Sequence, residues 1–424
     1  MGSALIINVA INLGSRILAI IVGVLLARNL GVSGYGVYAL CLSIVTVILV
    51  FTDLGMPTLI IRELSAAVSR NAYSLVLEII NTAVKTVAAA SALTGLALSV
   101  VIMLLQNDLL GIHATAIVAS SLLLPITAIN RVLSSALKGL GRVNWSQACD
   151  QIFTPTLSVL LVASLFFTDA RTRVPTYALY SQFVATSLSV AVLALLVRMR
   201  VSPFLDDRKV ESRTAGRTSA YWIGKSSPFV LVAATLLINN QIDVVILGWL
   251  RPPHDVGIYR VAGQGAMLVG FGLQVFNVVA APVFARQYAR QDSTGIRRTL
   301  LLARIASGGS ALAVTIFLFM FGQAGIAILF GPEYEASFIP MMILCAGFLV
   351  NAAFGPVGVL LSMTGHERAM IKILIGCGVA TIIADVVAAI WFGPVGVATS
   401  TALSLASFHL LFSIFASKSV VASR

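Results

Sequence analysis

The chain has 424 residues, of which 58% are apolar and only 10% are charged, with a formal net charge of +12. Soluble globular proteins are about 45–50% apolar and about 25% charged, so a soluble fold could not bury this much apolar surface. The composition also excludes a disordered chain, which is poor in apolar residues, and a disulfide scaffold, because all four cysteines lie in apolar runs. The class that remains is an all-α polytopic membrane protein.

Runs long enough to cross a bilayer follow one another along the whole chain. A transmembrane helix needs roughly 20 mainly apolar residues, because the hydrocarbon core is about 30 Å thick. This criterion predicts twelve spans, at residues 5–27, 37–57, 84–105, 114–136, 148–168, 174–197, 221–248, 258–284, 300–322, 337–361, 371–392 and 395–416. Only a turn at Gly393 and Pro394 separates the last two.

The distribution of Lys and Arg predicts the orientation, because cytoplasmic loops carry an excess of these residues. With the N-terminus in the cytoplasm, the inner segments hold nineteen Lys and Arg residues. The outer segments then hold five, namely Arg28, Arg171, Arg173, Arg251 and Arg260. Twelve spans return the C-terminus to the cytoplasm. The positive charge is therefore mostly a topology signal, and nucleic acid is not an expected partner.

One long polar stretch divides the chain. Residues 198–217 contain nine charged residues and predict a cytoplasmic linker between a six-helix lobe at 1–197 and a second at 218–424. Weak internal similarity supports two parallel repeats related by a pseudo-two-fold axis along the membrane normal. The recurrences, at offsets of 220–225, are Gly36-Val37-Tyr38 with Gly257-Ile258-Tyr259, Pro57 with Pro282, Leu109-Leu110-Gly111 with Leu329-Phe330-Gly331, and Gly141 with Gly365. Such an architecture is typical of secondary transporters that work by alternating access.

Four segments contain recognisable sequence motifs. They read A-R-N-L-G-V-S-G-Y-G-V-Y-A-L from Ala27, T-D-L-G-M-P-T-L-I-I-R-E-L-S from Thr52, I-L-F-G-P-E-Y-E-A-S from Ile328 and G-P-V-G-V-A-T-S-T-A-L-S from Gly393. Together they resemble the polysaccharide and O-antigen flippases of the multidrug/oligosaccharidyl-lipid/polysaccharide exporter superfamily. The resemblance covers essentially the whole chain.

This resemblance implies a two-lobed protein of the bacterial or archaeal cytoplasmic (inner) membrane. It would move an isoprenoid-diphosphate-linked oligosaccharide repeat unit to the outer leaflet, for synthesis of O-antigen, capsule or exopolysaccharide. The implied partners are this lipid-linked oligosaccharide, the membrane lipids, and a polysaccharide polymerase with its chain-length machinery. No cofactor is implied. The family has no invariant catalytic signature, so few residue roles can be transferred.

A polar stripe on the first span is the main candidate for a substrate path. Asn8, Asn12 and Arg16 follow one another at four-residue spacing, which places them on a stripe about 80° wide. Arg16 is near mid-membrane, where a charge faces the protein interior or water rather than lipid. We expect Arg16 to contact a diphosphate or sugar, because guanidinium binds phosphate oxygens in pairs. The alternative is an interhelical salt bridge or hydrogen bond that fixes packing.

The second half offers further candidates. Asn239 and Asp243 form a similar stripe with Thr235 on the seventh span. Arg260 and Gln264 share a face at the outer end of the eighth, and Arg260 either binds the head group or lies at the interface as a snorkelling arginine. Asp243 and Asp385, both within spans, are candidates for a coupling-ion site. Asp243 could equally pair with a base, accept a sugar hydroxyl or belong to a packing cluster.

Enzyme chemistry finds little support in the sequence. It contains no H-E-x-x-H, no Cys-x-x-Cys and no G-x-x-x-x-G-K-[ST] loop, so neither a metal site nor ATP hydrolysis is expected. The rival hypotheses are a multidrug or cation antiporter, a membrane polymerase or glycosyltransferase, and a structural partner of the polymerisation machinery. The arginine in the first span argues against a cation exporter, and the short loops argue against a polymerase.

Overall fold

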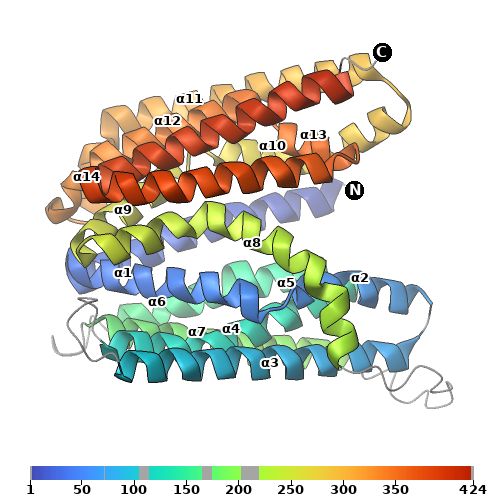
Figure 1. Cartoon of the computed structure of the whole chain (residues 1–424), viewed down its shortest axis with the longest axis horizontal. Helices are drawn as coiled ribbons and strands as arrows, with labels where there is room; N and C mark the ends of the chain where they lie inside the picture. Colours follow the sequence, from blue (N-terminus) through green and yellow to red (C-terminus); the bar gives the residue numbers. More distant parts are fainter. Residues whose placement is uncertain (1, 71, 105–113, 165–173, 202–218, 422–424) are drawn as a thin grey trace. The chain divides into compact units, whose positions relative to one another are not determined.

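The computed structural model describes residues 2–70, 72–104, 114–164, 174–201 and 219–421. Every regular element in these ranges is a helix, which confirms the predicted all-α class (Figure 1). The elements are α1 (Gly2–Thr52), α2 (Met56–Ser69), α3 (Tyr73–Leu104), α4 (Ala114–Gly139), α5 (Val143–Ala148), the π-helical turn η2 (Cys149–Phe153), α6 (Thr154–Ser164), α7 (Pro175–Val201), α8 (Ser219–Leu250), α9 (Pro253–Ala266), α10 (Phe271–Ala289), α11 (Ser293–Leu329), the 3-10 turn η6 (Pro332–Ser337), α12 (Phe338–Phe354), α13 (Val357–Met363), α14 (Glu367–Ala416) and the terminal π turn η7 (Ser417–Val421).

Two very long helices each contain two of the predicted spans. α1 runs through the expected loop at 28–36 and departs from helical geometry only at Gly31, whose φ and ψ are 66° and 177°. α14 departs from it at Gly393, with φ 57° and ψ −136°, immediately before Pro394. Glycine adopts a positive φ far more readily than residues that have a side chain. α1 and α14 are therefore each two helices that meet at a glycine, and the break expected after the first span is a kink at Gly31 rather than a loop over 28–36.

Seven helices within the described residues are long and apolar enough to cross a membrane, and eight if the bent pair α9 and α10 counts as one span. The axes of α9 and α10 differ by 51°. The predicted range 148–168 falls on the pieces α5, η2 and α6, which are individually short. The protein is multi-pass, while the count of twelve spans and the internal repeat stay predictions.

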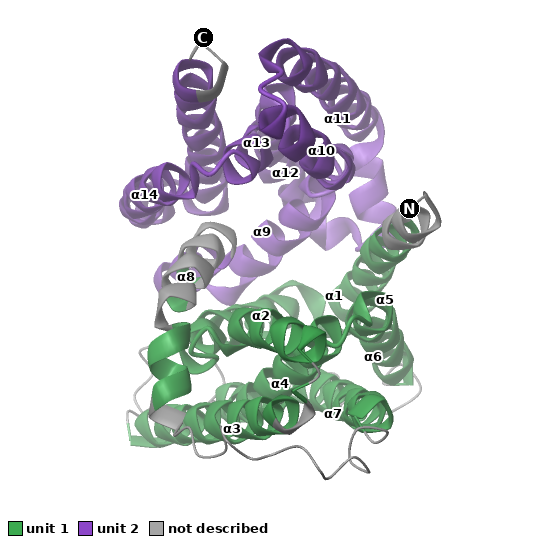
Figure 2. Ribbon diagram, turned by 90° about the vertical axis from the view of Figure 1, so that its right-hand side faces the viewer, with its two compact units in different colours: residues 1–237 green, residues 238–424 purple. Residues whose placement is uncertain are grey.

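The chain forms two compact units, which Figure 2 colours separately. Unit 1 comprises residues 1–237 and unit 2 comprises residues 238–424, so the division lies inside α8. The lobes expected at 1–197 and 218–424 stay a prediction. Most of the charged linker expected at 198–217 lies outside the described residues.

Helix α4 is the centre of unit 1. It contacts α1, α2, α3 and α7, and Ala128, Val132 and Ala136 on its apolar face are completely buried. Large apolar side chains such as Leu93, Leu96 and Leu104 on α3 are exposed instead. Apolar side chains on the outside and a tightly packed interior are what a bilayer favours, because lipid, unlike water, solvates them.

Unit 2 has its own apolar core. Phe284 of α10, Leu360 and Leu361 of α13 and Phe412 of α14 are buried in one cluster. Arg304 of α11 fixes the edge of this core: its Nε donates to the carbonyl of Phe354 at 2.9 Å, and its Nη2 donates to Ser413 Oγ at 3.1 Å. Arg304 therefore joins α11, α12 and α14 and has a structural explanation.

Candidate functional site

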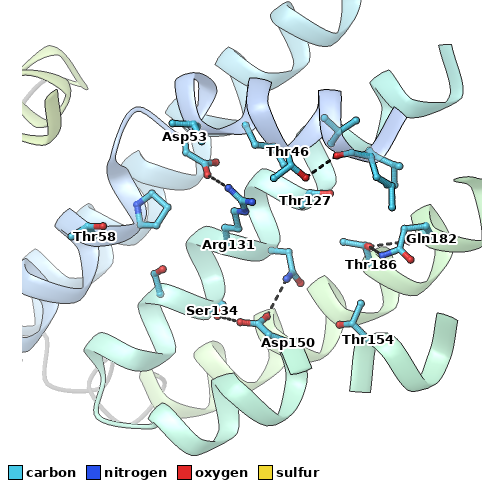
Figure 3. Close-up of a pocket in the computed structure, with 18 of the residues that line it drawn as sticks. Thr46, Asp53, Thr58, Thr127, Arg131, Ser134, Asp150, Thr154, Gln182 and Thr186 are labelled. Atoms are coloured by element: carbon cyan, nitrogen blue, oxygen red, sulfur yellow. Dashed lines mark hydrogen bonds and ion pairs between the residues drawn. The ribbon is translucent and has the colours of Figure 1, made fainter. Parts of the chain in front are cut away.

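A polar cavity of about 530 Å³ lies within unit 1. It is bounded by α1, α2, α4, η2, α6 and α7 (Figure 3). Its polar lining consists of Thr46, Asp53, Thr58, Thr127, Asn130, Arg131, Ser134, Ser135, Lys138, Asp150, Thr154, Gln182 and Thr186. Hydroxyls, amides and opposite charges thus share one chamber inside an otherwise apolar helix bundle. This chamber is the first candidate site.

Helix α4 contributes the largest share of the polar lining. Its polar residues recur at spacings of three and four, namely Thr127, Asn130, Arg131, Ser134, Ser135 and Lys138. Residues at these spacings lie on one face of a helix. The opposite, apolar face carries Ala128, Val132 and Ala136 into the core. α4 is therefore amphipathic within a membrane, with its polar stripe turned into the cavity rather than toward lipid.

Asp53 and Arg131 form an ion pair across the cavity. Arg131 Nη1 donates to Asp53 Oδ2 at 3.0 Å, and Figure 3 shows the two side chains pointing toward one another. Asp53 directly follows α1, and the turn through Leu54 (φ 50°) and Gly55 (φ 69°) starts α2. This turn fixes where the carboxylate lies. Its side chain is only 6% exposed, whereas that of Arg131 is 34% exposed.

A second carboxylate, Asp150, belongs to the π-helical turn η2. Asn130 Nδ2 donates to Asp150 Oδ1 at 3.2 Å, and Ser134 Oγ donates to Oδ2. Lys138 Nζ lies 3.9 Å from Oδ2. π-turns are frequent at functional sites, and this one turns a carboxylate toward the α4 stripe. All three of its partners lie on α4, so α4 carries the polar network of the cavity.

A separate ion pair joins α2 to the first turns of α8, within unit 1. Lys225 Nζ donates to Glu63 Oε2 at 2.9 Å and lies within 6 Å of the ring centres of Tyr221 and Trp222. Arg62 Nε donates to Glu63 Oε1 at 3.1 Å. α2 is not among the helices that could span a membrane. Burial raises the pKa of Glu63, but the hydrogen bonds and charges of Lys225 and Arg62 outweigh burial and lower that pKa below its usual value.

Unit 2 contains a compact cluster of acids and hydroxyls. Tyr259 Oη of α9 donates to Asp243 Oδ2 of α8 at 2.5 Å and lies 3.2 Å from Thr401 Oγ1 of α14. Asp243, Thr401 and Asp385 line one small cavity. Asp385 is completely buried. The Ser400 hydroxyl interacts with its carboxyl, but the geometry does not reach a hydrogen bond at either oxygen.

The candidates from the sequence are distributed over both units. Asn8, Asn12 and Arg16 all lie on α1, and Asn12 and Arg16 are half-buried. Asn239 lies on α8, but its side chain, like that of Asn8, is outside the described residues. Arg260 and Gln264 lie four residues apart on α9 and are half-buried. The structure brings Asp243 and Asp385 together in unit 2; the roles of all seven cavity candidates stay predictions.

Sequence reasoning missed Arg131 and Lys138. Arg131 lies inside the predicted span 114–136, so the argument that singled out Arg16 applies to it equally. Polar residues at spacings of three and four from 127 to 138 were a second signal. Asp53 and Asp150 could not be assigned as their partners from the sequence. They are separated from α4 by 78 and 12–20 residues and meet it only through tertiary packing.

Within the part of the chain that the structure describes, no group of three or more His, Cys, Asp or Glu side chains could hold a metal ion. The two candidate sites each contain two acids, Asp53 and Asp150 in unit 1 and Asp243 and Asp385 in unit 2. Their neighbours are hydroxyls, amides and basic side chains. Both candidate sites can therefore bind polar groups and ions.

The fold is similar to that of solved transporters. An inward-facing multidrug resistance MATE family transporter of the MOP superfamily superimposes with a TM-score of 0.73 and 14% identity, covering 96% of this chain and 95% of that one. The lipid II flippase MurJ, in an inward closed conformation, gives 0.70 and 13%, with 97% and 87% covered. A MOP superfamily transporter from Pyrococcus furiosus Vc1 gives 0.59 and 14%, with 98% and 92% covered.

No curated protein matches the chain. The family described as polysaccharide biosynthesis protein matches residues 2–287, which include the start of unit 2 and unit 1 except its first residue. This match covers more than half of the sequence and agrees with the resemblance of the four sequence motifs to those of polysaccharide flippases. The chain therefore belongs to the polysaccharide biosynthesis protein family and is a multi-pass membrane protein with the fold of the MOP-superfamily transporters.

Proposed function

We propose that this protein is a flippase for an isoprenoid-diphosphate-linked oligosaccharide, which it moves from the inner to the outer leaflet of the cytoplasmic membrane. The product would feed O-antigen, capsule or exopolysaccharide synthesis. The observation that carries the proposal is a cavity rich in hydroxyl, amide and charged side chains in a membrane protein of the polysaccharide biosynthesis protein family. The similar fold of the lipid II flippase MurJ supports it.

A flippase must solve a solvation problem. Moving polar and charged head groups through lipid costs several kcal/mol for each unsatisfied group. The protein lowers this cost by offering polar contacts to the head group while the isoprenoid tail stays in the bilayer. We assign the diphosphate contacts to Arg16 with Asn8 and Asn12. Asn239, Arg260 and Gln264 are the proposed contacts from the second half.

The proposed cycle is alternating access by movement of two lobes. Both termini lie in the cytoplasm in this proposal, as the bias of basic residues predicts. A polysaccharide polymerase and its chain-length machinery would consume the product at the outer face. No step of the cycle makes or breaks a covalent bond, so the protein acts as a transporter rather than an enzyme.

Asp385 and Asp243 are the proposed coupling site. Asp385 is fully buried without a hydrogen bond at either carboxyl oxygen, and an ionised carboxylate in that setting is strongly destabilised. Binding of a proton or a small cation relieves the cost. Asp243, Tyr259 and Thr401 supply further oxygens beside it. An ion gradient could thereby drive the change between inward-facing and outward-facing states.

The coupling proposal predicts that Asp385→Asn removes the dependence of transport on an ion gradient. In vesicles, an imposed proton or sodium gradient should accelerate translocation by the native protein, and the variant should translocate at the rate without a gradient. The reason is that an amide neither takes up a proton nor neutralises a cation. Asp255→Asn removes an acid of α9 that does not belong to the cluster and should keep the response. A gradient response retained by Asp385→Asn would contradict the assignment.

The function as a whole predicts where the substrate accumulates. Deleting the gene should leave diphosphate-linked repeat units on the inner leaflet and abolish the surface polymer, because a sugar head group does not cross lipid unaided. The measurement is accessibility of the lipid-linked units to an impermeant sugar-oxidising reagent in spheroplasts. Normal outer-leaflet levels in the deletion strain would overturn the proposal.

A multidrug or cation antiporter is the second candidate function. The observation that favours it is the similar fold of a multidrug resistance MATE family transporter, together with the acids of unit 2, Asp243 and the buried Asp385. What favours the flippase over the antiporter is the match of residues 2–287 to the polysaccharide biosynthesis protein family. Drug sensitivity of the deletion strain, with normal surface polymer, would favour the antiporter.

A further inference from the structure

We infer that the unit 1 cavity binds the sugar part of the substrate, a neutral and hydroxyl-rich saccharide, and not the diphosphate. This inference rests on the proposed function. It assigns the carbohydrate to the chamber formed by α4 and its partners, and it leaves the diphosphate to other basic residues.

The charges of the cavity compensate one another. Its lining holds two basic residues, Arg131 and Lys138, and two acids, Asp53 and Asp150. Each basic side chain lies within ion-pair distance of one acid, at 3.0 Å for Arg131 and 3.9 Å for Lys138. The formal charge of the four groups is zero. A diphosphate would have to compete with a carboxylate for each cation, and in a medium of low dielectric constant that competition is costly.

The carboxylate that a ligand meets first is Asp150. Its side chain is 27% exposed, whereas Asp53 is almost fully covered. An exposed carboxylate repels a phosphate but accepts hydrogen bonds from hydroxyl groups. Arg131 and Lys138, each about one-third exposed, donate to hydroxyl oxygens. The accessible groups therefore include both donors and acceptors, which suits a molecule whose groups both donate and accept.

The remaining lining strengthens the same conclusion. Thr46, Thr58, Thr127, Ser135 and Thr154 present hydroxyls, and Gln182 presents an amide. Asn130 Nδ2 donates a hydrogen bond to Asp150, while Asn130 Oδ1 is buried without a hydrogen bond. Asp53 Oδ1 is buried in the same way. These are two more acceptors, which a rotation of the covering side chains would expose to hydroxyl donors; an ionised diphosphate has no proton to give them.

The size of the cavity limits what it can hold. Ligand pockets of about 300–1,000 Å³ enclose most of a drug-sized molecule. At about 530 Å³ the chamber has room for one or two sugar rings, but not for a long repeat unit together with an isoprenoid chain. The cavity would thus recognise the end of the oligosaccharide, and the stripe on α4 would set the sugar specificity.

The test is protection of a cysteine placed in the cavity. Thr127→Cys, in a background without the four natural cysteines, is labelled with a maleimide in a detergent that has no sugar head group. The probes are lactose, cellobiose and N,N′-diacetylchitobiose on one side and inorganic diphosphate on the other. At least one saccharide should slow labelling several-fold, and diphosphate should not. Ser69→Cys, on the exposed end of α2, is the matched control, and its labelling should not change.

Two outcomes overturn the inference: protection by diphosphate, or labelling of Thr127→Cys that no probe changes. Thermal unfolding of the native protein with the same saccharides provides a readout that needs no variant, and at least one of them should raise the unfolding temperature. If protection fails while the deletion strain still strands lipid-linked units inside, the flippase proposal stands and this inference falls. If lipid-linked repeat units reach the outer leaflet at normal rates in the deletion strain, the flippase proposal is wrong whatever the cavity binds.

Discussion

Replacing Arg131 by methionine is expected to destabilise the protein by about 3 kcal/mol, because it leaves the carboxylate of Asp53 buried without its cation. Removing one partner of a buried ion pair costs about 3–5 kcal/mol, and the partial exposure of Arg131 favours the lower end. Methionine keeps an unbranched stem of similar length, so lost packing contributes little. The measurement is thermal or denaturant unfolding of the purified protein.

The double variant Arg131→Met with Asp53→Asn separates the charge from the geometry. It removes both charges, so we expect it to recover at least half of the lost stability. Arg142→Met is the matched control: Arg142 is exposed just after α4 and is not part of the cavity, and its replacement should change stability by less than about 0.5 kcal/mol. An Arg131→Met protein as stable as the native one would show that the ion pair does not hold α1 against α4.

Reversing the charge of Arg16 is expected to have the largest effect on transport. Arg16→Glu should lower surface polysaccharide by at least about tenfold, which corresponds to about 1.4 kcal/mol of lost interaction, because a carboxylate repels the diphosphate that the guanidinium binds. The polymer is measured at the cell surface, and membrane insertion is measured in the same cells. A normal amount of surface polysaccharide in cells with Arg16→Glu would show that Arg16 does not contact the substrate.

Two companion variants give this experiment its specificity. Arg28→Glu makes the same charge change on the same helix, at an exposed position, and should leave the polymer near its native level. Arg16→Lys keeps the charge but not the paired donors of guanidinium and should lower transport only in part. If Arg16→Lys and Arg16→Glu fail equally while insertion is normal, Arg16 acts through helix packing rather than through substrate binding.

The helices were largely predictable because their signal is local. Composition and the length of apolar runs determine a membrane helix residue by residue, since lipid rewards apolar side chains and requires every backbone group to be bonded within the helix. Within the described residues the predicted ranges accordingly fall mainly on helices, although breaks interrupt 258–284 and 337–361. A break between the first two spans was predicted, but as a loop, because Arg28 and the following glycines interrupt the apolar run. In the structure this break is a kink at one residue of positive φ, Gly31.

The candidate site was predicted less well, because it depends on which helices meet. Arg16 stood out as a charge in a span, and by the same argument Arg131 should have stood out too. The sequence contains the polar stripe of α4 at its helical spacing, but not its partners. Asp53 reads as part of a helix end, and its role in the cavity appears only when the turn at Leu54 and Gly55 places it 3.0 Å from Arg131.

The sequence by itself determined the class of the protein, the position of its helices and its resemblance to polysaccharide flippases. The low number of charged residues indicated the class, because a charge within a membrane span is costly and occurs there only where it has a structural or functional role. Tertiary structure alone decided that Arg131 and Lys138 lie beside carboxylates and that Asp243 and Asp385 line one cavity. Such pairings join residues far apart in the chain, and only packing of the helices brings them within the few ångströms over which a hydrogen bond or an ion pair acts.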